Sequence, residues 1–201
     1  MAEIKSALEL ALEKTEGIKV DKERLQAKEL KIKGRKAALA FLDSKTDAKE
    51  LKKEMKHCKG KEQEAFMDGA GTTFLSYLKL PTDENYKEEV LKAGEGIAAI
   101  SDNSKDVQQM FEQLVQFLDQ YVETKGQIET QLKAQFEPLL KQKEDALEAQ
   151  TGTRISIDPM DDPQFQQAYT QNMGQLQQNY VEALNNAKEQ LKQFIGMDDQ
   201  E

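Results

Sequence analysis

The chain has 201 residues and a formal net charge of −9, with 28 Lys or Arg against 37 Asp or Glu. Its 4 prolines, 11 glycines and helically spaced apolar residues exclude collagen-like and disordered chains, and no apolar run approaches the roughly 18 residues of a transmembrane helix. Because a single cysteine excludes an internal disulfide and the acidic N-terminal segment is unlike a signal peptide, we expect a cytoplasmic protein.

The first hundred residues predict a compact N-terminal part of about five helices. In chain order, apolar spacing indicates helices over about residues 3–15, 22–42, 48–68, 74–80 and 83–100. Glycine is a poor helix former, so we expect Gly17 to end the first helix and Gly60 to weaken the third. The glycine pairs in 69–71 and 94–96 are expected to mark further helix breaks.

The second half predicts a long antiparallel helical hairpin of the coiled-coil type. Apolar residues recur three and four apart over about 105–150, which predicts a helix on the order of 70 Å long. Pro138 lies inside this helix and is expected to bend it or end it. Asp162 and Pro163 supply the N-cap and first residue of a second long helix, over about 163–195. The expected organisation is therefore an N-terminal helical part (residues 1–100), a hairpin (101–196) and an acidic tail (197–201).

The reactive side chains predict no catalytic, cofactor or metal site. His57 is the only histidine, and the Glu54-x-x-His57 spacing occurs once, whereas carboxylate-bridged di-iron bundles need two copies. His57 and its neighbour Cys58 point about 100° apart on a helix, so they are poorly placed for a thiolate–imidazolium pair. The glycine segments match neither a P-loop nor a dinucleotide fingerprint. The aspartates of 158–162 lack the EF-hand spacing, and helix capping is the better account of Asp162.

Basic residues concentrate in the first third of the chain. Residues 1–62 carry 17 Lys or Arg and 12 Asp or Glu, whereas residues 63–201 carry 11 and 25. Two basic stripes each follow one helix face, and they consist of Arg24, Lys28, Lys31 and Arg35, and of Lys45, Lys49, Lys52, Lys56 and Lys59. Such stripes suit phosphates or an acidic partner, and the alternative is a solvated face or contact with the chain's own acidic half. Residues 1–73 contain no Tyr or Trp for base stacking, which argues against sequence-specific RNA reading.

An apolar seam along the two long helices is the second candidate interaction surface. Two helices that bury one stripe each are marginal alone, so they must pack on the N-terminal helices or on a second copy. The residues that we expect at this seam, and at a homodimer interface, are Leu114, Leu118, Tyr121, Tyr169, Leu176 and Tyr180.

Three segments also carry a family resemblance. They are the opening Met1-Ala-Glu-Ile-Lys-Ser-Ala-Leu-Glu-Leu-Ala-Leu-Glu-Lys-Thr15, the central Asp158-Pro-Met-Asp-Asp-Pro-Gln-Phe165 and the closing Tyr180-Val-Glu-Ala-Leu184. With these segments the chain resembles an uncharacterised family of small bacterial helical proteins, which is a domain of unknown function. The resemblance implies a bacterial, cytoplasmic, stand-alone protein and brings no activity, ligand or site residue with it.

The sequence therefore predicts an acidic, all-α, non-enzymatic interaction protein, acting as a scaffold, adaptor or chaperone-like binder. Its expected partner is another protein or a second copy of itself, with no cofactor and no membrane. The alternative is a ribosome- or RNA-associated accessory factor that binds through the basic stripes of residues 24–59.

Overall fold

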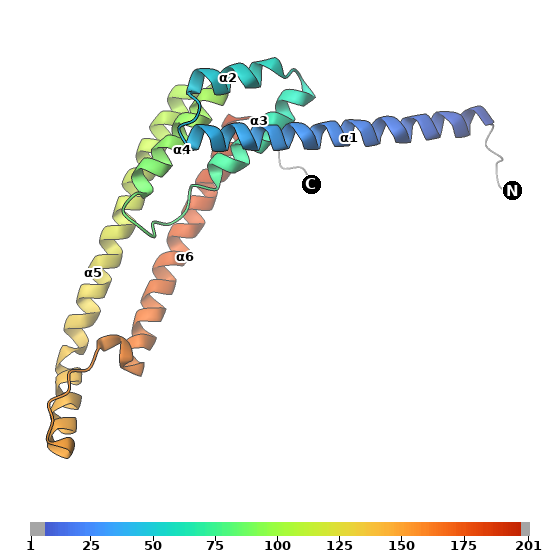
Figure 1. Ribbon diagram of the computed structural model, residues 1–201. Coiled ribbons are helices and arrows are strands. Elements are labelled where there is room, and N and C mark those ends of the chain that lie inside the picture. Colours follow the sequence, from blue (N-terminus) through green and yellow to red (C-terminus); the bar gives the residue numbers. More distant parts are fainter. Residues whose placement is uncertain (1–6, 198–201) are drawn as a thin grey trace. The chain divides into compact units, whose positions relative to one another are not determined.

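A computed structural model describes residues 7–197, with side chains described from residue 22 onwards. Over this range the chain is helical with no strand, so the all-α prediction is confirmed (Figure 1). The elements are α1 (Ala7–Leu42), α2 (Ala48–His57), α3 (Lys61–Leu75), α4 (Tyr86–Ile100), α5 (Ser104–Thr151), a 3-10 turn η1 (Pro159–Asp161) and α6 (Pro163–Phe194). None of the helices in this range is both long and apolar enough to cross a membrane. All but the first residue of the predicted acidic tail lies outside the described residues.

The described part of the first hundred residues holds four helices rather than about five. Helix α1 continues through Gly17, so the prediction that this glycine ends a helix is wrong. One glycine costs a helix only about 1 kcal/mol relative to alanine, which a helix of 36 residues tolerates. The chain breaks instead at Gly60, whose φ of 54° lies in the left-handed region that favours glycine. This break separates α2 from α3 within the segment predicted as one helix.

Helices α1 and α3 run parallel, with α2 as the return connection between them (Figure 1). The Gln26 side-chain amide donates a hydrogen bond to Glu62 at 2.6 Å near the start of α3. Near the end of α3, the rings of Phe41 and Phe74 meet edge to face with centroids 5.9 Å apart. Because the contacts advance in the same direction along both helices, the pair is parallel.

Two glycines bring the α1 and α3 backbones into direct contact. A Cβ atom added to Gly34 would lie 2.0 Å from the carbonyl oxygen of Phe66, and one added to Gly69 would lie 2.0 Å from the carbonyl oxygen of Lys31. Both distances are far shorter than any van der Waals contact. The close approach of these helices therefore depends on the absence of a side chain at both positions.

The predicted breaks at 69–71 and 94–96 are wrong, since both segments lie inside helices, α3 and α4. Their glycines are packing positions. A Cβ atom added to Gly94, for example, would lie 2.5 Å from the ring of Phe111. A glycine that looks like a helix break in the sequence is here a recess for an aromatic ring of another helix.

Packing divides the chain into two compact units, and the predicted boundary near residue 100 does not appear in this division. The first unit contains the described residues 7–78, 87–111 and 188–197, and the second contains residues 79–86 and 112–187. The largest side chains buried in the first unit include Phe66, Phe74, Ile97, Phe111 and Ile195. Helices α5 and α6 each contribute residues to both units.

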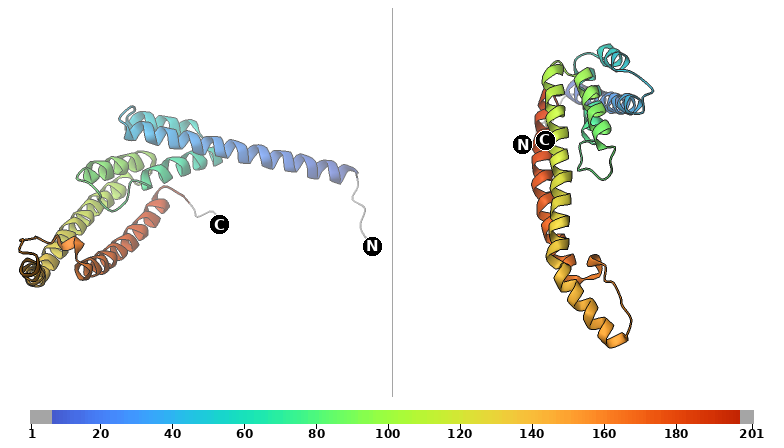
Figure 2. Two further views of the ribbon diagram at one scale, coloured as in Figure 1. Left: turned by 60° about the horizontal axis from the view of Figure 1, so that its bottom comes forward. Right: turned by 90° about the vertical axis from the view of Figure 1, so that its left-hand side faces the viewer.

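In the second unit, α5 and α6 run antiparallel (Figure 2). Phe117 packs on Tyr180 with ring centroids 4.6 Å apart, and Phe136 packs on Phe165 at 5.4 Å. Contacts therefore pair increasing residue numbers on α5 with decreasing residue numbers on α6, as in an antiparallel pair. Helix α5 continues through Pro138 to Thr151, so this proline does not end the helix, which was one of its two predicted effects.

Candidate functional site

The basic stripe predicted on α1 consists of three exposed side chains and one that packs toward α3. Arg24, Lys28 and Arg35 are exposed on the helix surface. Lys31 is half-buried and forms an ion pair with Asp68 of α3. Its charge is therefore part of the α1–α3 contact as well as of the stripe.

Helix α2 has one buried and one basic face. Asp47 caps its N-terminus by accepting a hydrogen bond from the backbone N–H of Glu50 at 2.8 Å, and the apolar side chains of Leu51 and Met55 are buried. The opposite face lines a shallow surface depression with the side chains of Lys49, Lys52, Lys53, Lys56 and His57, which we call the α2 basic cluster. Lys53 and His57 were not among the predicted stripe residues, although each follows another basic residue of the cluster by four positions.

The two ends of the second predicted stripe lie outside α2. Lys45 forms an ion pair with Asp43 at 2.8 Å in the turn before the helix. Lys59 is exposed in the connection between α2 and α3. The depression on α2 receives no residue from the α1 stripe, so the two stripes do not share one concave site.

The outward face of α1 carries a row of large apolar side chains, Leu25, Ile32 and Leu39, which we call the outer row. Their exposed fractions are 61%, 44% and 41%. Ile32 and Gly34 lie two positions apart, about 200° around the helix, so the outer row is on the side opposite the contact with α3. The seven-residue spacing was visible in the sequence, but its exposure was not.

The predicted seam residues of the long helices already have contacts within the chain. Leu114, Leu118, Tyr121 and Leu176 are buried. Tyr121 and Leu176 form one cluster with Met173, against which Tyr169 and Tyr180 pack. A second copy would have to displace these contacts to use the seam, and self-association through it stays a prediction.

Two tyrosine hydroxyls of the second unit are donors in fixed hydrogen bonds. Tyr169 donates to the Glu129 carboxylate at 3.0 Å, and Tyr86 donates to Asp119. Burial is the largest cause that raises the pKa of both tyrosines, to about 12 for Tyr86, and the neighbouring carboxylate adds to it. Both hydroxyls therefore stay protonated at neutral pH and serve as anchoring donors.

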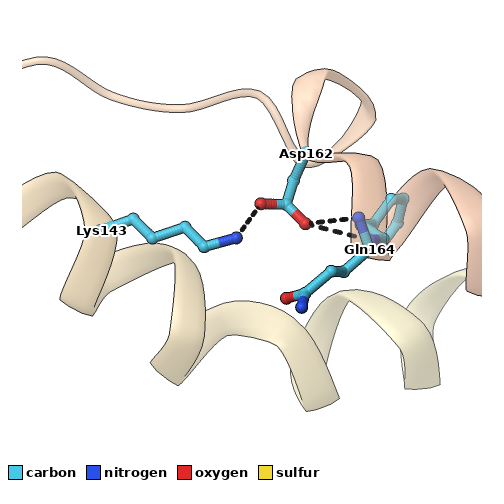
Figure 3. A network of polar contacts seen from close by, with 4 residues as sticks. Lys143, Asp162 and Gln164 are labelled. Atoms are coloured by element: carbon cyan, nitrogen blue, oxygen red, sulfur yellow. Dashed lines mark hydrogen bonds and ion pairs between the residues drawn. The ribbon is translucent and has the colours of Figure 1, made fainter.

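The connection between the long helices is fixed by Asp162 (Figure 3). Its Oδ1 accepts hydrogen bonds from the backbone N–H groups of Gln164 at 3.0 Å and Phe165 at 3.1 Å, and its Oδ2 pairs with the Lys143 ammonium of α5. The bond to Lys143 is the largest cause that holds the pKa of Asp162 below its usual range, followed by the bond from Phe165. The capping role predicted for this residue is confirmed, and its oxygens already have partners.

The adjacent His57 and Cys58 at the end of α2 differ in exposure. The Nδ1 atom of exposed His57 lies 2.6 Å from the backbone carbonyl oxygen of Lys53, whereas the Cys58 side chain is buried. Within the described range, no three His, Cys, Asp or Glu side chains gather closely enough to hold a metal ion.

Comparison with known proteins places the chain in a family but gives it no activity. No curated protein and no solved structure matches it. Residues 52–193 match a family of unknown function, DUF6657, and this match begins within α2 and ends within α6, so that α1 lies outside it. Since the match covers well over half of its residues, the chain belongs to the DUF6657 family of unknown function.

Proposed function

We propose that the protein is a non-enzymatic interaction protein, a scaffold, adaptor or chaperone-like binder, and that it contacts its partner through the outward face of α1. The observation that carries this proposal is the outer row, three large aliphatic side chains exposed at 41–61% on one helix face. Single exposed apolar residues are common on protein surfaces, but a row at heptad spacing supplies one of the two apolar positions per heptad that a helix–helix seam uses.

The energetics of the outer row are adequate for a specific contact. Complete burial of a Leu or Ile side chain is worth about 1.5–3 kcal/mol. Since roughly half of each side chain in the outer row is exposed, covering it would contribute on the order of 1 kcal/mol per residue. A partner helix on this face would gain a few kcal/mol before any charged contact is counted.

A second candidate is a ribosome- or RNA-associated accessory factor that binds through the α2 basic cluster. One observation favours it, because four lysines and a histidine surround a single depression on the exposed face of α2. Phosphate groups are bound by such clusters through charge, without base reading. This candidate predicts binding that weakens steeply as the salt concentration rises.

The experiment that separates the two candidates is a tagged pull-down from native lysate in untreated, nuclease-treated and high-salt arms. Four proteins are compared: the wild type, an outer-row variant (Leu25→Gln, Ile32→Gln, Leu39→Gln), a basic-cluster variant (Lys49→Glu, Lys52→Glu, Lys56→Glu) and a control variant (Val122→Gln, Val181→Gln). The control removes apolar side chains that are exposed at 43% and 42% on α5 and α6. All substituted residues are exposed, so circular dichroism should give the same helix content for all four proteins.

We expect one protein partner that survives nuclease, is retained by the control variant and is lost by the outer-row variant. Capture of ribosomal proteins that disappears with nuclease and in the basic-cluster variant would instead establish the second candidate. A partner that all four proteins retain equally in every arm would contradict both.

A further inference from the structure

We infer that the partner of the outer row is an acidic amphipathic helix of another protein, with apolar residues at heptad spacing between flanking Asp and Glu. This inference rests on the function proposed above and names the class of partner. Its basis is the combination of the outer row with the charges that border it.

Exposed cations lie along both sides of the outer row. In an α-helix, residues three or four positions away flank a given side chain on the same surface. Lys28 and Lys36 stand four positions before and after Ile32, and Arg35 stands three positions after it, and all three are exposed. The exposed carboxylate of Glu29, three positions before Ile32, is the one anion at these flanking positions, so cations outnumber it three to one. Residues 22–36 as a whole contain seven Lys or Arg and two Asp or Glu.

This charge pattern favours some kinds of partner for the outer row over others. A second copy of the same α1 segment would bring Lys and Arg rows against Lys and Arg rows, which is unfavourable at close range. A lipid surface is bound by helices with a broad apolar face, whereas the outer row is one residue wide and has cations within about 40° on either side. Nucleic acid would match the cations and leave the apolar row uncovered.

An acidic helix satisfies both parts of the surface. Its apolar seam would cover Leu25, Ile32 and Leu39, and its flanking carboxylates would meet the Lys and Arg side chains at the edges, where exposed charge pairs favour one partner and one orientation. The row runs over 15 residues, about 21 Å of helix, so the matching segment of the partner covers at least two heptads, and about three with its flanking residues.

The test uses synthetic peptides and the full chain. The first peptide is an acidic helix of about three heptads with Leu and Ile at the seam and Glu beside it. The second has the same composition with the apolar positions scrambled, and the third is the first with Lys in place of Glu. Anionic phospholipid vesicles form a fourth arm. Binding is followed by fluorescence anisotropy for the peptides and by sedimentation for the vesicles.

We expect the acidic heptad peptide to bind the wild type at least about tenfold more tightly than the scrambled or the basic peptide. The outer-row variant should lose at least about tenfold in affinity, as should the charge-reversal variant Arg24→Glu, Lys28→Glu, Arg35→Glu. The control variant Val122→Gln, Val181→Gln should stay within about twofold of the wild type.

Equal binding of the acidic and scrambled peptides would overturn the inference, and so would vesicle binding that depends on the outer row without peptide binding. Failure of the inference is distinguishable from failure of the proposed function. If the outer-row variant loses its lysate partner while no peptide binds, the interaction through α1 stands and the acidic-helix partner does not.

Discussion

At the scale of the residue, Asp162 shows how one carboxylate sets the geometry of a long connection. It accepts two backbone hydrogen bonds at the start of α6 and pairs with Lys143 of α5, so it ties both helices to one side chain. Because its pKa is lowered in the folded chain, folding favours the ionised form. The stability that Asp162 contributes is therefore present at pH values above the ordinary carboxyl pKa. It is lost as the pH falls through that pKa to the lower pKa of the folded chain.

Substitutions at Asp162 separate its capping role from its ion pair. Asn caps a helix about as well as Asp but carries no charge, whereas Ala does neither. At pH 7 we expect resistance to urea to fall in the order wild type, Asp162→Asn, Asp162→Ala. In acid the wild type and Asp162→Asn should converge, because the carboxyl is then protonated.

Urea unfolding followed by circular dichroism at neutral and acidic pH measures this. A gap between the wild type and Asp162→Asn that is equally wide at both pH values would show that the charge of Asp162 does not contribute.

At the scale of the element, the glycines of this chain have two different roles that the sequence does not distinguish. Gly34 and Gly69 allow α1 and α3 to touch backbone to backbone, while Gly126 and Gly174 sit in α5 and α6 with nothing within 4 Å of an added Cβ atom. The same residue type is thus required in one helix pair and dispensable in the other.

Alanine substitutions should change the free energy of unfolding in opposite directions at the two kinds of site. We expect Gly34→Ala to destabilise the protein by about 1–3 kcal/mol, because its Cβ atom would overlap the backbone of Phe66 and force the helices apart. The matched controls Gly126→Ala and Gly174→Ala should stabilise it by roughly 0.5–1 kcal/mol through helix propensity.

Urea unfolding followed by circular dichroism measures the free energy of unfolding of each variant, and thus whether each substitution stabilises or destabilises the protein. If Gly34→Ala stabilises the protein as the controls do, the close approach of α1 and α3 is not a constraint.

These cases also explain how far the sequence predicts the structure. The two long helices and the Asp162 cap follow from local signals, which are apolar periodicity and an Asp-Pro start, so their bounds are predicted closely. The break predicted at Gly69 was wrong because a glycine recess is a property of two helices in contact. The break predicted at Gly17 was wrong because one glycine costs a long helix only about 1 kcal/mol. A pattern read along one helix contains no information about its neighbour.

For the outer face of α1, the sequence predicts the positions of the charged residues but not the exposure of the apolar ones. Spacing alone places Arg24, Lys28 and Arg35 on one face of α1. The same spacing identifies Leu25, Ile32 and Leu39 as a row but does not say whether the row is covered. In the fold, α3 packs on the small residues around Gly34, which leaves the larger aliphatic side chains facing outward.

At the scale of the whole molecule, the surfaces suited to a partner differ in chemistry. The outer row of α1 combines exposed aliphatic groups with flanking cations, the α2 basic cluster offers charge alone, and the seam residues of α5 and α6 are already packed within the chain. An interaction that depends on burial of apolar surface therefore has its best-matched site on α1.

The most direct test of this account is site-specific photo-crosslinking in the native host. A photoreactive amino acid is placed at position 32 in the outer row and, as a matched control, at position 122, which is exposed to the same degree, 43% against 44%. We predict that irradiation joins one protein partner to the chain from position 32 and not from position 122. No adduct from position 32, or the same adducts from both positions, would contradict the central claim that the protein acts through the outward face of α1.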